Sequence, residues 1–429
     1  MMKDLLVIFH FKQEEDKTFT ATMESPDQSS NVIDAGEVEV KGDSLLMDIS
    51  VMHSSYTAKY FPDSNAYIGV LKQYGFKIPL KIVKGDAEDL LFKRTQKISR
   101  PYPYYDEEVK VFNVKGGDTL AGTFTKPNAK GKYPVAILIT GSGPEDRNES
   151  VFGHKPFLVL ADYLTRKGFA VLRCDDRGTA KSTGNFATAT SADFATDVEA
   201  QIDYLKKRKD VDTKRIGLIG HSEGGVVAPL VASKRNDVAF IVMMAGVGVG
   251  MFDNLYIQDS LVAASMGYSK EGLQNYLYQQ KTMFGFITSS KDSSTAANKL
   301  YQYLSGSGAS DQIVNAAIKQ LCSPWMRWFI GYDPAEHLKK VQCPVLAING
   351  DKDVQVPAEL NITAIEKTLR EIGNKNFRTE ILPGLNHLFQ HCNKCTVSEY
   401  REIEETINPE VLKYIGEWLG KYFIDQPHN

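Results

Sequence analysis

Residues 214 to 228 read Lys214-Arg-Ile-Gly-Leu-Ile-Gly-His-Ser-Glu-Gly-Gly-Val-Val-Ala228. The apolar run at the start has the length of a buried strand, and the small and apolar residues at the end are compatible with a helix. Between them lies a Gly-x-Ser-x-Gly pattern centred on Ser222. A serine on a tight strand-to-helix turn sits in strained backbone, and glycines two positions away on either side relieve the clash between its neighbours. The stretch therefore predicts a nucleophile elbow, with the serine hydroxyl exposed at the start of a helix.

The segments around this elbow alternate between buried strands and amphipathic helices. Strands are expected at 133–140, 170–175, 215–220, 240–244, 344–350 and 378–382, and helices at 157–167, 191–207, 223–233, 357–372 and 410–422. Ser191 is the expected N-cap of its helix. Together with a hairpin at 109–124, this alternation predicts an α/β core over 108–246 and 336–429, in which a mostly parallel sheet carries helices on both faces.

No strand pattern occurs between residues 247 and 335, where four helical runs and several aromatic side chains lie instead. An insertion at this point of the chain would lie over the carboxyl ends of the strands, where open α/β sheets bind their ligands. We therefore expect a helical cap over 247–335 that walls a substrate pocket, with Trp325 among the substrate-binding residues.

Residues 1–84 show evenly spaced, alternating strand patterns separated by turn residues, and Pro79 within the last pattern indicates an edge strand. The pattern predicts a small antiparallel β accessory domain, either a sandwich or a partial barrel. Residues 85–107 are polar and proline-containing, which is typical of a linker.

A serine hydroxyl becomes a nucleophile only with a base, and the base needs a carboxylate to orient it. Two later strand ends carry such groups in the order that an α/β hydrolase uses. Asp353 lies in the loop that follows the strand at 344–350, and His387 lies in the loop after the strand at 378–382. They are the predicted acid and base, whereas Asp351 suits a role in fixing the turn and His391 lies farther from the strand end.

The amides that stabilise an acyl oxyanion are expected on two sides of the serine. One belongs to Glu223, directly after the nucleophile, and the other to the loop after the strand at 133–140. There Ser142 is the predicted donor and Gly143 the alternative, and Gly141 and Gly143 let the backbone approach the substrate closely. His221 lies inside the elbow and cannot easily turn back onto its neighbour's hydroxyl, so it is expected to be a packing residue.

Composition excludes several classes of function. The 429 residues carry a net charge of −3, which argues against a nucleic-acid-binding protein, and the longest apolar runs are of strand length, too short to span a bilayer. Cys392 and Cys395 form a C-x-x-C pair without a second pair to complete a zinc site, so a local disulfide or two reduced thiols is expected rather than a metal. The start of the chain lacks the pattern of a signal peptide, which predicts a cytoplasmic protein as written, or an exported one if the N-terminus is truncated.

The chain resembles the α/β-hydrolase superfamily, and within it a bacterial carboxylesterase group that is dienelactone-hydrolase-like and bile-acid-acyltransferase-like. The resemblance covers residues 108 to 425, and Ser142, Ser222, Glu223, Asp353 and His387 fall on the family's working positions. Met23 to Gln28 resemble the small β domain that precedes the hydrolase in some members, which usually carry an export signal. The sequence departs from the family at Thr179-Ala180 and at the C-x-x-C pair. The matching stretches are 140–147, 174–178, 182–184, 220–225, 323–325, 332–334, 343–357, 386–389 and 404–407.

These features predict a serine hydrolase that cleaves small carboxylic esters with short acyl chains through an acyl-enzyme on Ser222, without a cofactor or metal. A thioesterase, acyltransferase or peptidase would use the same residues on another acyl group. A carbohydrate- or lipid-binding protein acting through its β domain is the alternative from a different class. The sequence leaves the oligomeric state open, with a homodimer among the options.

Overall fold

The computed structural model describes residues 7–14, 16, 18–25, 29–49, 54–73, 76–85, 93–307 and 310–423. Contacts between residues divide the chain into unit 1, Met1–Lys93, and unit 2, Arg94–Asn429. The expected linker lies at the boundary between these units, and its residues 86–92 fall outside the described part of the chain, as do residues 1–6 at the N-terminus.

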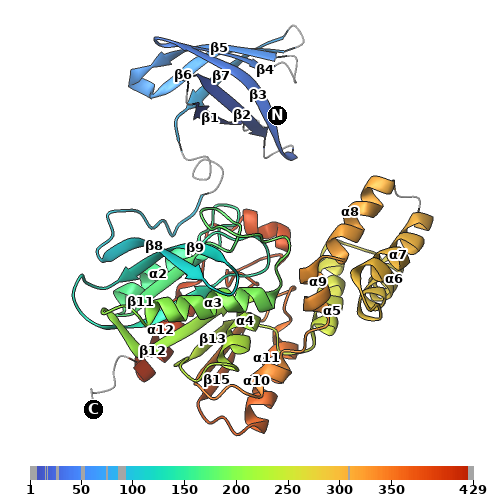
Figure 1. Cartoon of the computed structure of the whole chain (residues 1–429). Helices are drawn as coiled ribbons and strands as arrows, with labels where there is room; N and C mark the ends of the chain where they lie inside the picture. The colour runs from blue at the N-terminus through green and yellow to red at the C-terminus, as the bar shows by residue number, and fades with distance from the viewer. Residues whose placement is uncertain are drawn as a thin grey trace. The chain divides into compact units, whose positions relative to one another are not determined.

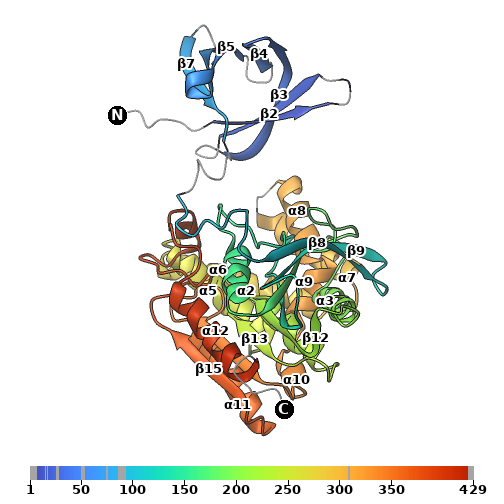
Figure 2. The same cartoon turned by 90° about the vertical axis from the view of Figure 1, so that its left-hand side faces the viewer.

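Unit 1 is an antiparallel meander in which each strand pairs with the next along the chain (Figure 2). Its core lies on one face of the sheet, around Met47, Ile49 and Tyr56. The sequence did not predict β5, because its inward positions are partly filled by small residues, Ser54 and Ala58, rather than by bulky apolar ones. The strands are β1 (Ile8–Gln13), β2 (Phe19–Ser25), β3 (Ser29–Lys41), β4 (Ser44–Ile49), β5 (Ser54–Phe61), β6 (Ala66–Gln73) and β7 (Phe76–Val83).

Unit 2 is built on an eight-stranded sheet with the order β15-β14-β13-β12-β10-β11-β9-β8 (Figure 1). The strands from β10 to β15 run parallel to one another, while β9 is antiparallel to both β8 and β11. The strands are β8 (Tyr105–Asn113), β9 (Asp118–Lys126), β10 (Tyr133–Ile139), β11 (Ala170–Cys174), β12 (Val211–His221), β13 (Ile241–Met244), β14 (Val345–Gly350) and β15 (Phe377–Leu382).

Helices cover both faces of this sheet, as expected from strands that are apolar on both sides. In β10 the side chains of Val135 and Ile137 pack against one layer of helices, and those of Ala136 and Leu138 against the other. The first layer contains α3 (Ser191–Leu205), α4 (Gly224–Ala232) and α11 (Ala358–Glu371), and the second contains α2 (Pro156–Arg166) and α12 (Pro409–Phe423). The predicted fold class is thereby confirmed.

The helical insertion between β13 and β14 is also present, and its helices gather at one side of unit 2 (Figure 1). Part of it has a small core of its own around Phe284, Leu300 and Ile330. No helix among the described residues is long and apolar enough to cross a membrane. The insertion comprises α5 (Met251–Ser265), α6 (Lys270–Thr288), α7 (Ser293–Leu304), α8 (Asp311–Leu321) and α9 (Pro324–Ile330), and the four-residue α10 (Ala335–Leu338) leads back to the sheet.

The segment from Arg94 to β8, which we expected to belong to a linker, is tied to unit 2. The guanidinium of Arg94 is buried and donates to the carbonyl oxygens of Phe152, Arg401 and Ile403. The backbone amide of Thr95 donates to the carbonyl oxygen of Glu404 at 3.1 Å. Residues at the start of unit 2 therefore lie against a loop that is about 310 residues later in the chain.

The N-cap of α3 is Thr190 and not Ser191, which corrects the sequence-based expectation. Thr190 forms a capping box with Asp193, in which each side chain accepts from the other residue's backbone amide. The hydroxyl of Ser191 donates instead to the carboxylate of Glu223 in the turn after β12. The predicted position was off by one because Thr190 and Ser191 are both good capping residues, and only Thr190 has an acidic residue three positions later.

Gly224 should tolerate no side chain, because a Cβ there would lie 2.1 Å from the carbonyl oxygen of Ile139 in β10. We expect Gly224→Ala to lower the free energy of unfolding of unit 2 by about 3 kcal/mol or more, because the clash is with backbone. Urea denaturation followed by tryptophan fluorescence measures it, since Trp325, Trp328 and Trp418 all belong to unit 2.

The matched control is Gly285→Ala in α6, where a Cβ would meet nothing within 4 Å. This variant should be neutral or up to about 1 kcal/mol more stable, because alanine favours a helix over glycine. Equal unfolding midpoints for the two variants would contradict the close approach at Gly224.

Candidate active site

Ser222 lies on the sharp turn between β12 and α4 and has a φ of +53°, in the left-handed region that residues with side chains rarely adopt. The turn brings the residues on either side of it together. A Cβ at Gly220 would lie 2.0 Å from the carbonyl oxygen of Gly224, so both positions require glycine. The hydroxyl of Ser222 consequently stands at the amino end of α4, where the helix dipole favours negative charge.

His387 and Asp353 meet in the loops that follow β15 and β14. His387 Nδ1 lies 2.7 Å from Asp353 Oδ2, and both side chains are buried. The other carboxylate oxygen of Asp353 accepts the backbone amides of Gln355 at 2.8 Å and Val356 at 2.9 Å, which fix its orientation. Since a carboxylate only accepts hydrogen bonds, Nδ1 carries the proton and Nε2 is left as the basic nitrogen of His387.

Ser222 and His387 line the same cavity, which has a volume of about 330 Å³. Gly141, Ser142, Glu223 and Trp325, also singled out by the sequence, belong to its wall, whereas Gly143 does not and Asp353 lies behind His387. The insertion contributes Asn254, Leu255 and Gln258 from α5 and Trp325 and Phe329 from α9. The remaining lining residues are Glu145, Glu149, Val151, Phe152, His221, Val247, Gln355, Val356, Leu388, Val397 and Tyr400.

The two alternatives to the acid and base lie elsewhere. Asp351 accepts the backbone amide of Gly384 at 2.6 Å, which ties the turn after β14 to the turn after β15. His391 Nδ1 accepts from the side-chain amide nitrogen of Asn408 at 2.7 Å, and most of its side chain is exposed. Neither residue lines the cavity that contains Ser222.

The loop after β10 presents its amides next to the serine. The amide of Gly141 donates to Glu149 Oε1 at 2.8 Å, so it is already engaged. Within the described part of the chain, the amides of Ser142 and Glu223 donate to no protein acceptor. These are the two amides that were predicted from the sequence as donors to an oxyanion.

The side chain of Glu223 has partners that the sequence did not reveal. Its carboxylate is buried, and Oε1 accepts from the hydroxyl of Ser191 and from Trp325 Nε1 at 2.8 Å. Burial raises the pKa of this carboxyl, while hydrogen bonds from Ser191, Trp325 and the Ser142 side chain lower it by less. The carboxylate therefore joins α3, the elbow and α9 of the insertion at one point beside the cavity.

A second buried acid–histidine pair lies behind the elbow. His221 Nδ1 is 2.9 Å from Glu149 Oε1, and His221 Nε2 is 2.9 Å from the carbonyl oxygen of His387. The expectation that His221 is only a packing residue therefore omits these two bonds. Glu149 was missed altogether, and its signal in the sequence is no more than an acidic residue a few positions after the Gly141–Gly143 loop.

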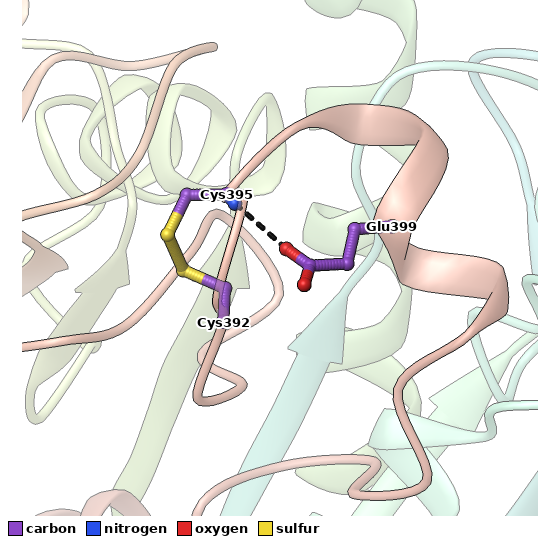
Figure 3. A group of neighbouring side chains, drawn as sticks. All are labelled: Cys392, Cys395 and Glu399. Atoms are coloured by element: carbon purple, nitrogen blue, oxygen red, sulfur yellow. Dashed lines mark hydrogen bonds between the residues drawn. A yellow bond between two sulfur atoms is a disulfide. The ribbon is translucent and has the colours of Figure 1, made fainter.

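Among the described residues, one group has the composition of a metal site. The ligand atoms of Cys392, Cys395 and Glu399 lie within 4.8 Å of one another (Figure 3). The two sulfurs are joined in a disulfide. The carboxylate of Glu399 accepts the backbone amides of Asn393, Lys394 and Cys395 at 3.1, 2.9 and 2.7 Å. The two sulfurs and the Glu399 carboxylate are thus engaged in holding the loop together.

Comparison with known proteins matches residues 116–371 to one family, described as X-Pro dipeptidyl-peptidase (S15 family). Esterase EstD of Thermotoga maritima is 26% identical over 344 residues, covering 79% of this chain and 74% of that protein. The bifunctional esterase/perhydrolase DCH of Acinetobacter calcoaceticus is 27% identical over 307 residues, covering 66% of this chain and 97% of its own. A solved structure of a Pyrococcus furiosus esterase aligns with a TM-score of 0.47 at 17% identity, covering 78% of this chain and 98% of that one.

Trp325→Phe tests the bond between the insertion and the elbow, because it removes the indole donor to Glu223 and keeps an aromatic ring that can stack on Phe329. We expect the free energy of unfolding to fall by about 1.5–3 kcal/mol, the range for a hydrogen bond to a charged group. Urea denaturation followed by circular dichroism measures it.

Trp328→Phe is the matched control. Its ring stacks on Tyr332 at the same 4.5 Å centroid distance as Trp325 on Phe329, and among the described residues its indole nitrogen has no protein acceptor. Equal losses in the two variants would show that the Trp325–Glu223 bond contributes nothing to stability.

Proposed function

Since the chain belongs to the S15 family of X-Pro dipeptidyl-peptidases, within the α/β-hydrolase superfamily, we propose that it is a serine hydrolase that cleaves carboxylic esters with short acyl chains. Ser222 is the nucleophile, His387 the base and Asp353 the acid that orients it. One observation carries the proposal: His387 is held by Asp353 at 2.7 Å and opens into the cavity that also contains Ser222.

In the first step Ser222 Oγ attacks the carbonyl carbon of the ester and gives its proton to His387 Nε2. Asp353 keeps the proton of His387 on Nδ1 and stabilises the imidazolium that forms. The buried position of both side chains strengthens this interaction, because water does not screen it. Collapse of the tetrahedral intermediate expels the alcohol, which takes the proton from Nε2, and leaves an acyl group on Ser222.

The negative charge of each tetrahedral intermediate falls on the former carbonyl oxygen. The amides of Ser142 and Glu223 stabilise this oxygen, and each such donor contributes about 3 kcal/mol in the transition state. The left-handed backbone of Ser222 and the start of α4 hold the Glu223 amide in place. Water activated by His387 then attacks the acyl-enzyme and releases the carboxylic acid.

The size of the cavity supports a small substrate. Its volume of about 330 Å³ is near the lower end of the roughly 300–1,000 Å³ of small-molecule sites. Side chains of α5 and α9 close one side of it, so the insertion acts as a cap that limits the acyl group. Relatives that carry the name esterase support an ester rather than a thioester as the substrate.

The family description favours a second candidate, a peptidase that removes an X-Pro dipeptide with the same residues. The two functions differ in both the acyl group and the leaving group, and parallel assays with a nitrophenyl acetate or butyrate and an aminoacyl-prolyl anilide separate them. We expect kcat/KM for the ester to exceed that for the anilide by at least about 100-fold, which is a difference of about 2.7 kcal/mol in transition-state binding. The opposite order would make the peptidase the function.

Ser222→Ala should lower kcat for ester hydrolysis on the order of a million-fold, because removal of a triad serine leaves only binding and the oxyanion donors. The same variant should no longer react with a fluorophosphonate probe, which mass spectrometry of the labelled peptide checks. Turnover or labelling that survives the substitution would refute the proposed nucleophile.

Asp353→Asn should lower kcat by about 10⁴ while the fold is retained, because asparagine presents an amide to His387 Nδ1 and forces the wrong tautomer. Asp351→Asn is the control, since it sits at the same strand end but bonds to the amide of Gly384 instead of His387. Its kcat should stay within a few-fold of the parent. Similar losses in both variants would contradict the choice of Asp353 as the acid.

A further inference from the structure

We propose that Glu149 and His221 form a positioning pair that fixes the oxyanion loop and the base loop against the nucleophile elbow. The inference rests on the proposed function of Ser222 and His387. Neither Glu149 nor His221 touches the reacting atoms in this proposal. They act through the backbone of the residues that do.

Three hydrogen bonds connect the three loops through this pair. Gly141 N, in the oxyanion loop, donates to Glu149 Oε1 at 2.8 Å. The same oxygen lies 2.9 Å from His221 Nδ1, in the elbow. On the other side of the imidazole, Nε2 lies 2.9 Å from the carbonyl oxygen of His387, in the base loop. His221, next to Ser222, thus connects Gly141, next to Ser142, to the backbone of His387.

Both ring nitrogens of His221 face hydrogen-bond acceptors, and this fixes the protonation of the ring. A carboxylate oxygen and a carbonyl oxygen can only accept, so each ring nitrogen must donate. A neutral imidazole has one N–H and would point a lone pair at one of the two oxygens. The arrangement therefore fits an imidazolium whose positive charge is balanced by the carboxylate of Glu149.

The surroundings favour this charge state. Burial lowers the pKa of His221, but the Glu149 carboxylate and the two hydrogen bonds raise it more, to about 9. The charged or titratable groups that face the ring are Glu149 and Glu145 from the loop after β10, Asp353 beyond β14 and His387 beyond β15. Phe389 packs against the ring edge, and apolar side chains surround the rest.

The backbone of Glu149 also indicates that its position is imposed by tertiary contacts. Its φ is +55°, in the left-handed region that residues with side chains rarely adopt. Such a conformation persists where the surroundings over-determine it, and here the Gly141 amide and His221 both hold the carboxylate. The consequence is that the Ser142 amide, one residue after Gly141, keeps a fixed position relative to Ser222.

The protonation of His221 can be observed directly in the full chain, labelled with ¹⁵N-histidine. The nitrogen shifts of His221, assigned with His221→Gln, should show two N–H groups at pH 7.5 and the loss of one as the pH rises through about 9. Because the folded state raises the pKa of His221, the charged ring and its two hydrogen bonds are present below that pH and are lost above it. A neutral ring with a single N–H at pH 7.5 would overturn the proposal.

Glu149→Gln gives the functional test on the proposed ester substrate. We expect kcat to fall about 10- to 100-fold, with KM changed less than about threefold, because small misplacements of reacting groups affect the transition state most. Without the carboxylate the pKa of His221 falls, so the alkaline limb of the kcat profile should move to lower pH. A kcat within twofold of the parent, or an unmoved limb, would overturn the proposal.

His337→Gln is the matched control, since this half-buried histidine bonds to Tyr332 and lies outside the cavity wall. Its kcat and pH profile should match those of the parent, and a loss equal to that of Glu149→Gln would mean that any histidine–partner bond has the same effect. The proposed function and this inference fail separately. Retained turnover in Ser222→Ala would refute the nucleophile, whereas the nitrogen shifts of His221 test the pair without any substrate.

Discussion

The close approach of β12 and α4 at Ser222 is the constraint on which the rest of unit 2 depends. The strand must end and the helix must begin within three residues, and a side chain at Gly220 or Gly224 would collide with backbone atoms at about 2 Å. The turn places the serine at the carboxyl edge of a central strand, next to β10 and β13. The loop after β10 carries Ser142, and the loops after β14 and β15 carry Asp353 and His387.

Features that follow from local pattern could be predicted from the sequence. Strand runs, helix periodicity and the glycine-flanked serine are local. Asp353 was preferred to Asp351, and His387 to His391, from their positions in the loops after two predicted strands, and in the structure Asp353 and His387 lie 2.7 Å apart. Features that depend on tertiary contacts between segments without a shared pattern were missed. Glu149 meets His221 across 72 residues, and Trp325 meets Glu223 across 102. The β5 strand was missed for another reason, because small inward side chains hide its alternation.

The carboxylates around the site differ in the groups that they contact. The Glu149 carboxylate bonds to His221 and that of Asp353 to His387, at 2.9 and 2.7 Å. Glu145 has neighbours of its own sign, and burial together with Glu149 and Asp146 raises its pKa to about 7. Glu223 relies on neutral donors alone, and burial raises its pKa as well. Glu145, Glu149 and Glu223 thus line one cavity with different partners, while Asp353 lies behind His387.

The bonds between Arg94 and the carbonyl groups of residues 401 and 403 limit when the contacts of unit 2 can form during protein synthesis. On a ribosome that adds 5–20 residues per second, the carbonyl groups of residues 401 and 403 appear roughly 15–60 s after Arg94, whereas that of Phe152 appears within about 3–12 s. Until then Phe152 is the only one of these three carbonyl partners that has been synthesised, and the other N–H groups of the guanidinium stay hydrated. The contacts around Arg94 in unit 2 are therefore completed only once residues 401–403 have been synthesised, although Ser222 is synthesised well before them.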